Sequence, residues 1–293
     1  MENPDSSCEA CTDGTCAVKS APKGENPEKQ KAEKNLRQRL CHIQNKILIM
    51  SGKGGVGKSS TAVNLALALA MQEQAVGLLD VDIHGPSVPK MLGVEGAVTL
   101  MDGVSLLPVN AFGLKVMSLG LMLENPDDAV IWRGAMKHGV IRQMIGEVAW
   151  GYLDYLVVDC PPGTGDEPLS VAQTLGGGTR AVIVTTPQDV AILDVRKSID
   201  FCRQLNIPIL GIVENMSGFA CPGCGQVHHI FKEGGGVSLA AETGVPFLGA
   251  IPLDPTLVAA GDAGMPCLIT QPDGAVAKVF ANLARQILEI SEK

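Results

Sequence analysis

Short runs of aliphatic residues recur along the chain, each bounded by glycine, proline or polar residues. Continuous apolar runs of roughly four to eight residues are typical of strands covered on both faces of a parallel sheet. The pattern predicts strands at residues 46–51, 75–80, 155–159, 180–185, 209–215 and 246–251.

Helical patterns alternate with these strands. Residues 60–71 combine alanine and leucine, which are good helix formers, and further helices are predicted at 136–148, 190–205 and 275–290. The last helix has one apolar face, which indicates core packing. Strands that alternate with helices predict a three-layer α/β fold, with a mostly parallel central sheet and helices on both faces.

Two stretches depart from this alternation. Residues 21–39 are rich in lysine, glutamate, glutamine, proline and asparagine, and they predict a linker that ends in a charged helix. Residues 93–135 hold short apolar pieces between glycines and prolines, and they predict an excursion of small strands. We therefore expect residues 1–40 to form a flexible, cysteine-containing segment and linker, and residues 41–293 to form the folded domain.

The composition narrows the class of protein. Of the 293 residues, 46% are hydrophobic and 3% aromatic, which predicts an aliphatic core. A net charge of −8 argues against a nucleic-acid partner. No apolar run approaches the length of a membrane span, and the N-terminus is unlike a signal peptide. We expect a cytoplasmic protein without nucleic-acid or membrane partners, whose nine cysteines are reduced or bind metal.

Residues 52–59 read G-K-G-G-V-G-K-S and match the phosphate-binding motif G-x-x-x-x-G-K-[ST] at every position. The motif lies between a predicted strand and a predicted helix, as it requires. Its backbone N–H groups and the helix N-terminus hold a phosphate chain. Lys58 is expected to reach the β- and γ-phosphates, and the Ser59 hydroxyl to bind Mg²⁺. The residues predicted to bind ATP here are Gly52, Lys53, Gly54, Gly55, Val56, Gly57, Lys58, Ser59 and Ser60.

Lys53 is a second lysine that an ordinary phosphate-binding loop does not need. It is either a solvated loop lysine or a cation that neutralises charge on the transferred phosphoryl group. The loop resembles the deviant Walker A loop of the MinD, ParA and nitrogenase-iron-protein class. That resemblance implies a homodimer in which Lys53 points across the interface to the partner's nucleotide.

Acidic residues follow two predicted strands, at the edge where doubly wound folds bind ligands. Asp80 and Asp82 come at the end of strand 75–80, and Asp159 ends strand 155–159. We expect Asp82 to orient the attacking water and Asp159 to stand beside Mg²⁺ as a Walker B carboxylate. Asp80 is expected to support the metal or the loop, and loop capping is the alternative for both Asp80 and Asp82.

Two further residues are predicted to complete the nucleotide site. Gly163 lies in the loop after Asp159, where its amide is placed to sense the γ-phosphate. Asn215 ends strand 209–215, and its amide offers a donor and an acceptor to a base. Its position corresponds to the asparagine with which related ATPases read the adenine edge. Cys160 is interpreted as a packed thiol, with a metal ligand as the alternative.

Cys221 and Cys224 form a C-x-x-C pair, which alone is ambiguous among a redox dithiol, zinc and an iron–sulfur cluster. His228 and His229 are candidates to complete a mononuclear zinc site. Alternatively, two thiols from each chain of a dimer surround a shared 4Fe–4S cluster. We favour the shared cluster because Lys53 independently argues for a dimer.

Three more cysteines lie near the N-terminus in a C-x₂-C-x₄-C run, Cys8, Cys11 and Cys16. Three thiolates at this spacing can chelate one metal centre if a fourth ligand comes from Cys41, another subunit or a non-cysteine group. A tail with incidental cysteines is the equally weighted alternative.

The motifs together resemble the Mrp/ApbC/Nbp group of iron–sulfur cluster carrier ATPases over about residues 40–290. The motifs that carry the resemblance are G-K-G-G-V-G-K-S, D-V-D-I-H-G-P-S, V-V-D-C-P-P-G-T-G-D, E-N-M-S and C-P-G-C followed by G-G-G. The resemblance implies slow ATP hydrolysis, a homodimer, a labile 4Fe–4S cluster bridged by Cys221 and Cys224, and delivery of that cluster to apo-proteins. The N-terminal cysteines are similar to the ferredoxin-like motif of the Nbp branch, without its first cysteine.

Two other functions share the loop and the dimer. A MinD/ParA-like positioning ATPase would use the cysteines for structural zinc and would bind lipid or DNA. The mixed charges on the last helix and the negative net charge disfavour it. An electron-transfer ATPase like the nitrogenase iron protein also bridges a cluster, but C-P-G-C is unlike its cluster cysteines. We therefore expect an ATP-dependent cluster carrier that uses ATP, Mg²⁺ and a 4Fe–4S cluster.

Overall fold

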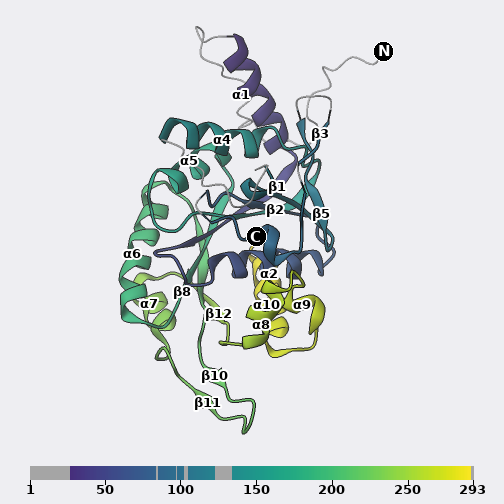
Figure 1. Cartoon of the computed structure of the whole chain (residues 1–293). Coiled ribbons are helices and arrows are strands. Elements are labelled where there is room, and N and C mark those ends of the chain that lie inside the picture. Colours follow the sequence, from purple (N-terminus) through teal and green to yellow (C-terminus); the bar gives the residue numbers. More distant parts are fainter. Residues whose placement is uncertain (1–26, 84, 97, 102–104, 123–133, 292–293) are drawn as a thin grey trace.

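The computed structural model describes residues 27–83, 85–96, 98–101, 105–122 and 134–291. Its main feature is an eight-stranded sheet in the order β12-β9-β8-β1-β7-β2-β6-β5, with helices on both sides (Figure 1). Neighbouring strands are parallel except β5 and β6. The strands are β1 (Ile43–Ser51), β2 (Val76–Asp80), β5 (Val109–Ala111), β6 (Leu114–Ser118), β7 (Leu153–Asp159), β8 (Thr179–Thr185), β9 (Ile209–Glu214) and β12 (Phe247–Ala250).

Two aliphatic core clusters, one on each face, hold the helices against the sheet. The first face carries α4 (Gly134–Gly146), α5 (Asp166–Leu175), α6 (Asp189–Gln204) and α7 (Gly235–Thr243). The second face carries α2 (Lys58–Ala70), α3 (Val88–Met91), α8 (Pro255–Asp262), α9 (Cys267–Thr270) and α10 (Ala275–Ser291). The predicted three-layer α/β fold is confirmed.

The stretch predicted as an excursion of small strands contributes more to the fold than its pattern indicated. β6 is a strand of the main sheet and pairs in parallel with β2. Its Leu114, Val116 and Met117 are completely buried. Within this stretch, β3 (Leu100–Met101) and β4 (Ser105–Leu106) form a small antiparallel pair apart from the main sheet. The glycines and prolines around β6 interrupt the alternation of strands and helices from which the strands of the main sheet were predicted.

Helix α1 (Pro27–Leu40) is the charged helix predicted at the end of the linker. Its Leu36 is buried against Gly146 of α4. Glu33 forms an ion pair with Arg142 (2.8 Å), so α1 packs along α4. The predicted N-terminal metal ligands lie outside the described residues: Cys8, Cys11 and Cys16.

A small hairpin projects from the body of the molecule after β9 (Figure 1). It consists of β10 (Phe219–Ala220) and β11 (Val227–His228), and the C-P-G-C sequence lies between these strands. Because β1, β2, β7 and β9 are parallel, the segments that follow them all leave the sheet at the same edge. None of the described helices combines the length and apolar character that crossing a bilayer requires.

Candidate functional site

The phosphate-binding loop joins β1 to α2, and α2 begins at Lys58. Gly55 and Gly57 adopt φ values of 78° and 81°, a left-handed conformation that favours glycine. Gly57 is also in close contact with Asn215, since a Cβ there would lie 2.0 Å from the Asn215 Nδ2. The Asn215 Nδ2 donates to the Val56 carbonyl oxygen (2.9 Å). The predicted base-reading residue is therefore fixed against the loop.

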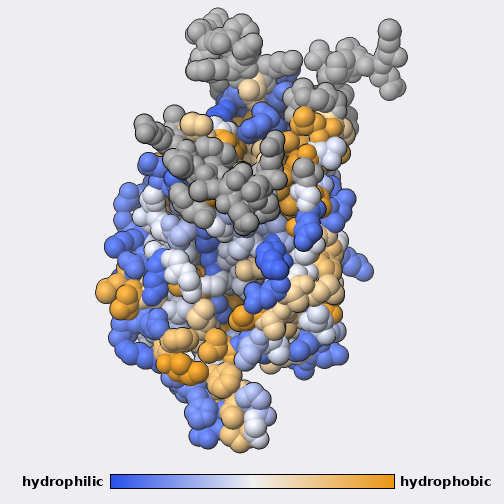
Figure 2. All heavy atoms as spheres, viewed as in Figure 1, coloured by the Kyte–Doolittle hydropathy of each residue, from blue (hydrophilic) through white to orange (hydrophobic). Residues whose placement is uncertain are grey.

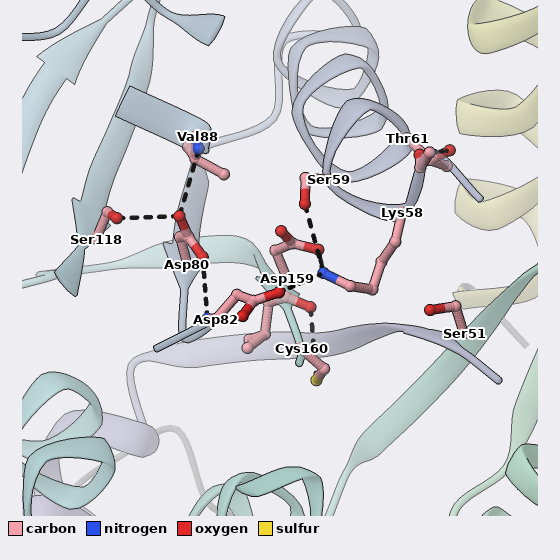
Figure 3. A network of polar contacts seen from close by, with 12 residues as sticks. Ser51, Lys58, Ser59, Thr61, Asp80, Asp82, Val88, Ser118, Asp159 and Cys160 are labelled. Carbon is pink, nitrogen blue, oxygen red and sulfur yellow. Dashed lines mark hydrogen bonds and ion pairs between the residues drawn. The ribbon is translucent and has the colours of Figure 1, made fainter. Parts of the chain in front are cut away.

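Lys58 and Asp159 form a buried ion pair at the centre of the site (Figure 3). The Lys58 Nζ lies 2.6 Å from the Asp159 Oδ1 and 3.8 Å from the Asp82 Oδ2. Burial alone would lower the pKa of Lys58, but the neighbouring Asp159 carboxylate raises it above its ordinary value. The lysine therefore carries a full positive charge where the motif predicts the phosphates.

The oxygens around Lys58 suit a hard divalent cation. The second carboxylate oxygen of Asp159, Oδ2, is buried without a hydrogen-bond partner. A buried unpaired carboxylate oxygen is costly unless a ligand completes it. The Ser59 hydroxyl is near the same lysine, with its Oγ 3.4 Å from the Lys58 Nζ. Mg²⁺ prefers such oxygen ligands, so the donor set fits the ion that the sequence predicted.

Asp80 holds the loop that carries Asp82. Its Oδ1 accepts from the Asp82 N–H (3.0 Å), and its Oδ2 accepts from the Ser118 hydroxyl (3.0 Å) and the Val88 N–H (3.3 Å). Figure 3 shows these contacts beside Asp159. Burial, and next the Asp159 charge, raise the pKa of Asp80 to about 8. Of the roles considered for Asp80, its contacts favour loop support.

The backbones of Gly163 and Lys53 both hydrogen-bond to Ser51, the last residue of β1. The Gly163 N–H donates to the Ser51 carbonyl oxygen (2.9 Å), which fixes the loop after Asp159 beside the phosphate loop. The Ser51 hydroxyl donates to the Lys53 carbonyl oxygen (2.9 Å). Within the described residues, the Lys53 side chain makes no hydrogen bond or ion pair. No described residue therefore holds its ammonium group in place.

Two adjoining spaces extend from this loop. One of about 210 Å³ lies over the loop glycines, Lys58 and Asp82. The other, of about 300 Å³, runs beside α2 to Asn215 and Pro252. Gly57, Ser60, Ser87 and Met91 border both spaces. Their arrangement accommodates a phosphate chain at one end and an apolar, hydrogen-bonding moiety such as a base at the other.

Sequence reasoning missed the outer wall of the larger space. Leu253, Leu257 and Cys267 line it, from the end of β12 through α8 and α9. The available signal was the sequence Pro252-Leu253-Asp254-Pro255, which is a helix start. The Asp254 side chain caps α8 by accepting from the Thr256 N–H (2.8 Å), and Pro255 is its first residue.

Cys221 and Cys224 lie at the turn of the projecting hairpin, half-exposed and exposed respectively. Hydrogen bonds from the Gly223 and Cys224 N–H groups, and then from the Cys224 thiol, lower the pKa of Cys221. Among the described residues, no three histidine, cysteine, aspartate or glutamate side chains converge as a metal site. Within residues 134–291, His228 and His229 therefore do not complete a zinc site with the two thiols.

The other thiols are packed. Cys160, Cys202 and Cys267 are buried, and burial raises the pKa of each. The interpretation of Cys160 as a packed thiol agrees with this position. Cys41 is exposed at the end of α1.

A family model matches residues 42–288: the NUBPL iron-transfer P-loop NTPases of the ParA type. The match covers the sheet, the phosphate loop and the cysteine hairpin. This chain belongs to that family. The reaction class of this family is the hydrolysis of a nucleoside triphosphate bound at the phosphate loop.

Curated relatives of this NUBPL-family NTPase share about half of their residues with it. A protein of Saccharolobus solfataricus named iron-sulfur cluster carrier protein is 49% identical over 268 residues, covering 91% of this chain and 90% of the relative. A protein of the same name from Methanocaldococcus jannaschii is 49% identical over 255 residues, covering 87% of each.

Solved structures agree with the fold of this NUBPL-family NTPase. The nucleotide-binding protein of Archaeoglobus fulgidus, in complex with ADP and with cobalt, has a TM-score of 0.73 and 39% identity, covering 85% of this chain and 96% of the other. The cell division ATPase MinD of Pyrococcus furiosus has a TM-score of 0.61 and 23% identity, covering 84% and 99%. The second likeness supports the fold alone.

Proposed function

We propose that this chain is an ATP-dependent iron–sulfur cluster carrier, which holds a labile 4Fe–4S cluster between two copies and transfers it to apo-proteins. The observation that carries the proposal is the exposed half-site of Cys221 and Cys224. A 4Fe–4S cluster takes four thiolates, and each chain offers two on a hairpin clear of its body. Two copies related by a two-fold axis supply the full set. The names of the curated relatives support the same function.

The residues of the loop have distinct tasks in nucleotide binding and hydrolysis. Lys58 exchanges its contact with Asp159 for the β- and γ-phosphates, which frees the carboxylate. Ser59 and Asp159 would hold Mg²⁺, which neutralises charge on the phosphate oxygens. Asp82 lies 3.8 Å from the Lys58 Nζ and orients the attacking water. Lys53 reaches the partner's nucleotide. The Gly163 N–H, which donates to the Ser51 carbonyl oxygen here, exchanges that contact for the γ-phosphate and so reports its loss.

Anaerobic reconstitution with iron and sulfide tests the carrier function. We expect a brown dimer with about two iron atoms per chain at the hairpin and the visible absorption of a 4Fe–4S cluster. The variant with Cys221→Ala and Cys224→Ala should lose this cluster. Incubation with an apo-protein that requires a 4Fe–4S cluster should then activate the acceptor, and added ATP should change the rate of transfer.

Two control variants separate the hairpin from the other cysteines. Cys41→Ser removes an exposed thiol outside the hairpin and should leave the iron bound at Cys221 and Cys224 unchanged. Replacing Cys8, Cys11 and Cys16 by serine shows whether the N-terminal run holds metal of its own, as we propose with a fourth ligand from elsewhere. Stoichiometric zinc without iron, or equal iron in the hairpin variant and the wild type, would overturn the carrier function.

A further inference from the structure

Glu214 lies at the base of the cysteine hairpin and is almost completely buried, with 1% of its surface exposed. Its Oε1 accepts from the Ser217 hydroxyl (2.6 Å), and its Oε2 accepts from the Gly236 N–H (2.5 Å). The chain leaves β9 for the hairpin through Ser217, and it returns at Gly236 in the first turn of α7. One carboxylate therefore holds both ends of the hairpin.

The glycines after the hairpin make this contact possible. A Cβ at Gly236 would lie 3.1 Å from the Glu214 Oε2, and a Cβ at Gly235 would lie 2.5 Å from the Pro187 carbonyl oxygen. The N-terminus of α7 also favours a nearby negative charge. The G-G-G sequence at 234–236 thus allows α7 to begin directly on the Glu214 carboxylate.

The same segment forms a wall of the larger space at the nucleotide site. Asn215, which follows Glu214, lines that space and bonds to the phosphate loop at Val56. The Ser217 N–H donates to the Ile251 carbonyl oxygen (2.9 Å), so the hairpin base is joined to the strand that leads into the opposite wall. A ligand that shifts Asn215 therefore acts on a segment only four residues before β10, the first strand of the hairpin.

Helix α6 provides a second connection, from the phosphate loop to the returning end of the hairpin. A Cβ at Gly52 would lie 2.3 Å from the Asp194 carbonyl carbon, so the loop rests directly on the α6 backbone. At the start of α6, Asp189 forms an ion pair with Lys232, which lies between β11 and α7. Both ends of the hairpin are thus attached to segments that line or contact the phosphate loop and the space beside it.

We propose that Glu214 is a positioning residue that couples nucleotide occupancy to the geometry of the Cys221–Cys224 pair. By holding Ser217 and Gly236 together, it makes the hairpin move as a unit when the wall of the nucleotide site moves. Without the Glu214 carboxylate, the same movement would separate Ser217 from Gly236 and leave the positions of the two thiols unchanged. A role for this coupling in cluster transfer rests on the proposed carrier function. The coupling between nucleotide and thiols can nevertheless be measured without a cluster.

Thiol reactivity of the full-length, cluster-free protein tests this coupling. The rates at which iodoacetamide alkylates Cys221 and Cys224 are measured by mass spectrometry without nucleotide and with saturating ADP or ATP. In the wild type we expect nucleotide to change these rates by at least about threefold, because it shifts the hairpin population. Glu214→Ala should abolish the change while the nucleotide Kd stays within about threefold.

Matched variants distinguish coupling from a general structural effect. In Glu214→Gln the amide oxygen can accept from Gly236 and the amide nitrogen can donate to Ser217, so the nucleotide effect should be retained. Glu242→Ala removes another carboxylate of α7, which pairs with Arg196 and not with the hairpin, and it should also retain the effect.

Three results would overturn the inference: a wild type without a nucleotide effect, a folded Glu214→Ala protein that keeps the full effect, or loss of the effect in Glu214→Gln. If Glu214→Ala does not fold, Ser217→Ala removes only the outgoing contact, and an undiminished effect there counts against the inference. Failure to bind iron would refute the carrier function, whereas the thiol rates would still decide the coupling.

Discussion

At the scale of single residues, the charged side chains of the phosphate site, Lys53, Lys58 and Asp159, have polar atoms that a bound nucleotide and metal ion would contact. Lys58 is paired with Asp159, whose other oxygen is buried and unpaired. The Lys53 side chain forms no hydrogen bond or ion pair within the described residues. In the proposed function, a triphosphate with Mg²⁺ would pair with each of these groups. Because Lys58 would bind the nucleotide of its own chain and Lys53 that of the partner, removing each lysine should affect binding and hydrolysis differently.

Lys58→Ala should reduce the kcat for ATP hydrolysis by at least about a hundredfold and also weaken nucleotide binding, because the lysine acts inside its own site. Lys53→Ala should reduce kcat by a similar factor while the nucleotide Kd changes by less than about threefold. Steady-state hydrolysis and calorimetric titration with ADP measure the two effects. Equal loss of nucleotide binding in both variants would contradict the role of Lys53 across the interface.

Mixing the two inactive variants provides a complementation test. In a mixed dimer, the Lys53→Ala chain keeps an intact Lys58 for its own nucleotide and receives Lys53 from its Lys58→Ala partner. Hydrolysis should therefore recover in the mixture, up to about a quarter of wild-type activity for random pairing of equal amounts. Activity no greater than the sum of the separate variants would show that Lys53 acts within its own chain.

Asp80 should make stability depend on pH. Its pKa in the folded protein is raised from 3.8 to about 8, so the unfolded chain releases this proton at a lower pH than the folded chain. The resulting contribution to stability is complete below about pH 4 and is lost as pH rises toward 8. Relative to Asp80→Asn, the wild type should lose up to about 1.4 kcal/mol of unfolding free energy per pH unit in this window.

Urea unfolding at pH 5, 6.5 and 8, in EDTA and without nucleotide, measures this difference. The comparison with Asp80→Asn cancels the titration of the shared groups that do not interact with Asp80. The variant also alters the hydrogen bonds to Val88 and Ser118, but to first order that cost does not vary with pH. A difference that stays constant, or that moves in favour of the wild type as pH rises, would contradict the raised pKa of Asp80.

At the scale of elements, the phosphate loop depends on its contact with α6. Gly52→Ala places a Cβ 2.3 Å from the Asp194 carbonyl carbon, so the loop or the helix must move. We expect a loss of about 2 kcal/mol or more in stability, a melting temperature lower by several degrees, and weaker ADP binding. Gly54→Ala is the matched control, because a Cβ there meets nothing within 4 Å. Equal melting temperatures for the two variants would contradict the contact.

The main elements were predictable because each has a strong local pattern. The buried strands β1, β7 and β9 and the helix α10 were predicted within a few residues of their observed bounds. Short elements such as α7 and the β10–β11 hairpin have no pattern long enough to predict. The role of Glu214 was equally hidden, because its partners Ser217 and Gly236 meet it only after the chain folds back.

At the scale of the whole molecule, exposed apolar side chains lie beside the phosphate loop. Val190 and Leu193 at the start of α6 are 66% and 63% exposed, and Ile230 and Val237 near the hairpin base are 57% and 50% exposed. Figure 2 shows hydrophobic residues on the surface in the region of α6, α7 and the hairpin. Leu193 directly precedes Asp194, whose backbone contacts Gly52. The surface on which Lys53 would meet a partner therefore adjoins apolar area that a second copy can cover.

Leu193→Lys should weaken the proposed dimer, because it places a charge within this apolar area while leaving the nucleotide site of each chain intact. Sedimentation velocity with ATP should show a dimer dissociation constant raised by at least about tenfold, which corresponds to about 1.4 kcal/mol. Hydrolysis per chain should fall at low protein concentration and recover at high concentration, since Lys53 acts only in the dimer. Met71→Lys is the control: Met71 is also exposed, but it lies at the opposite end of α2 from the phosphate loop. If both variants dimerise as the wild type does, the apolar area beside the loop is not the interface, and another surface must bring Lys53 and the paired thiols together.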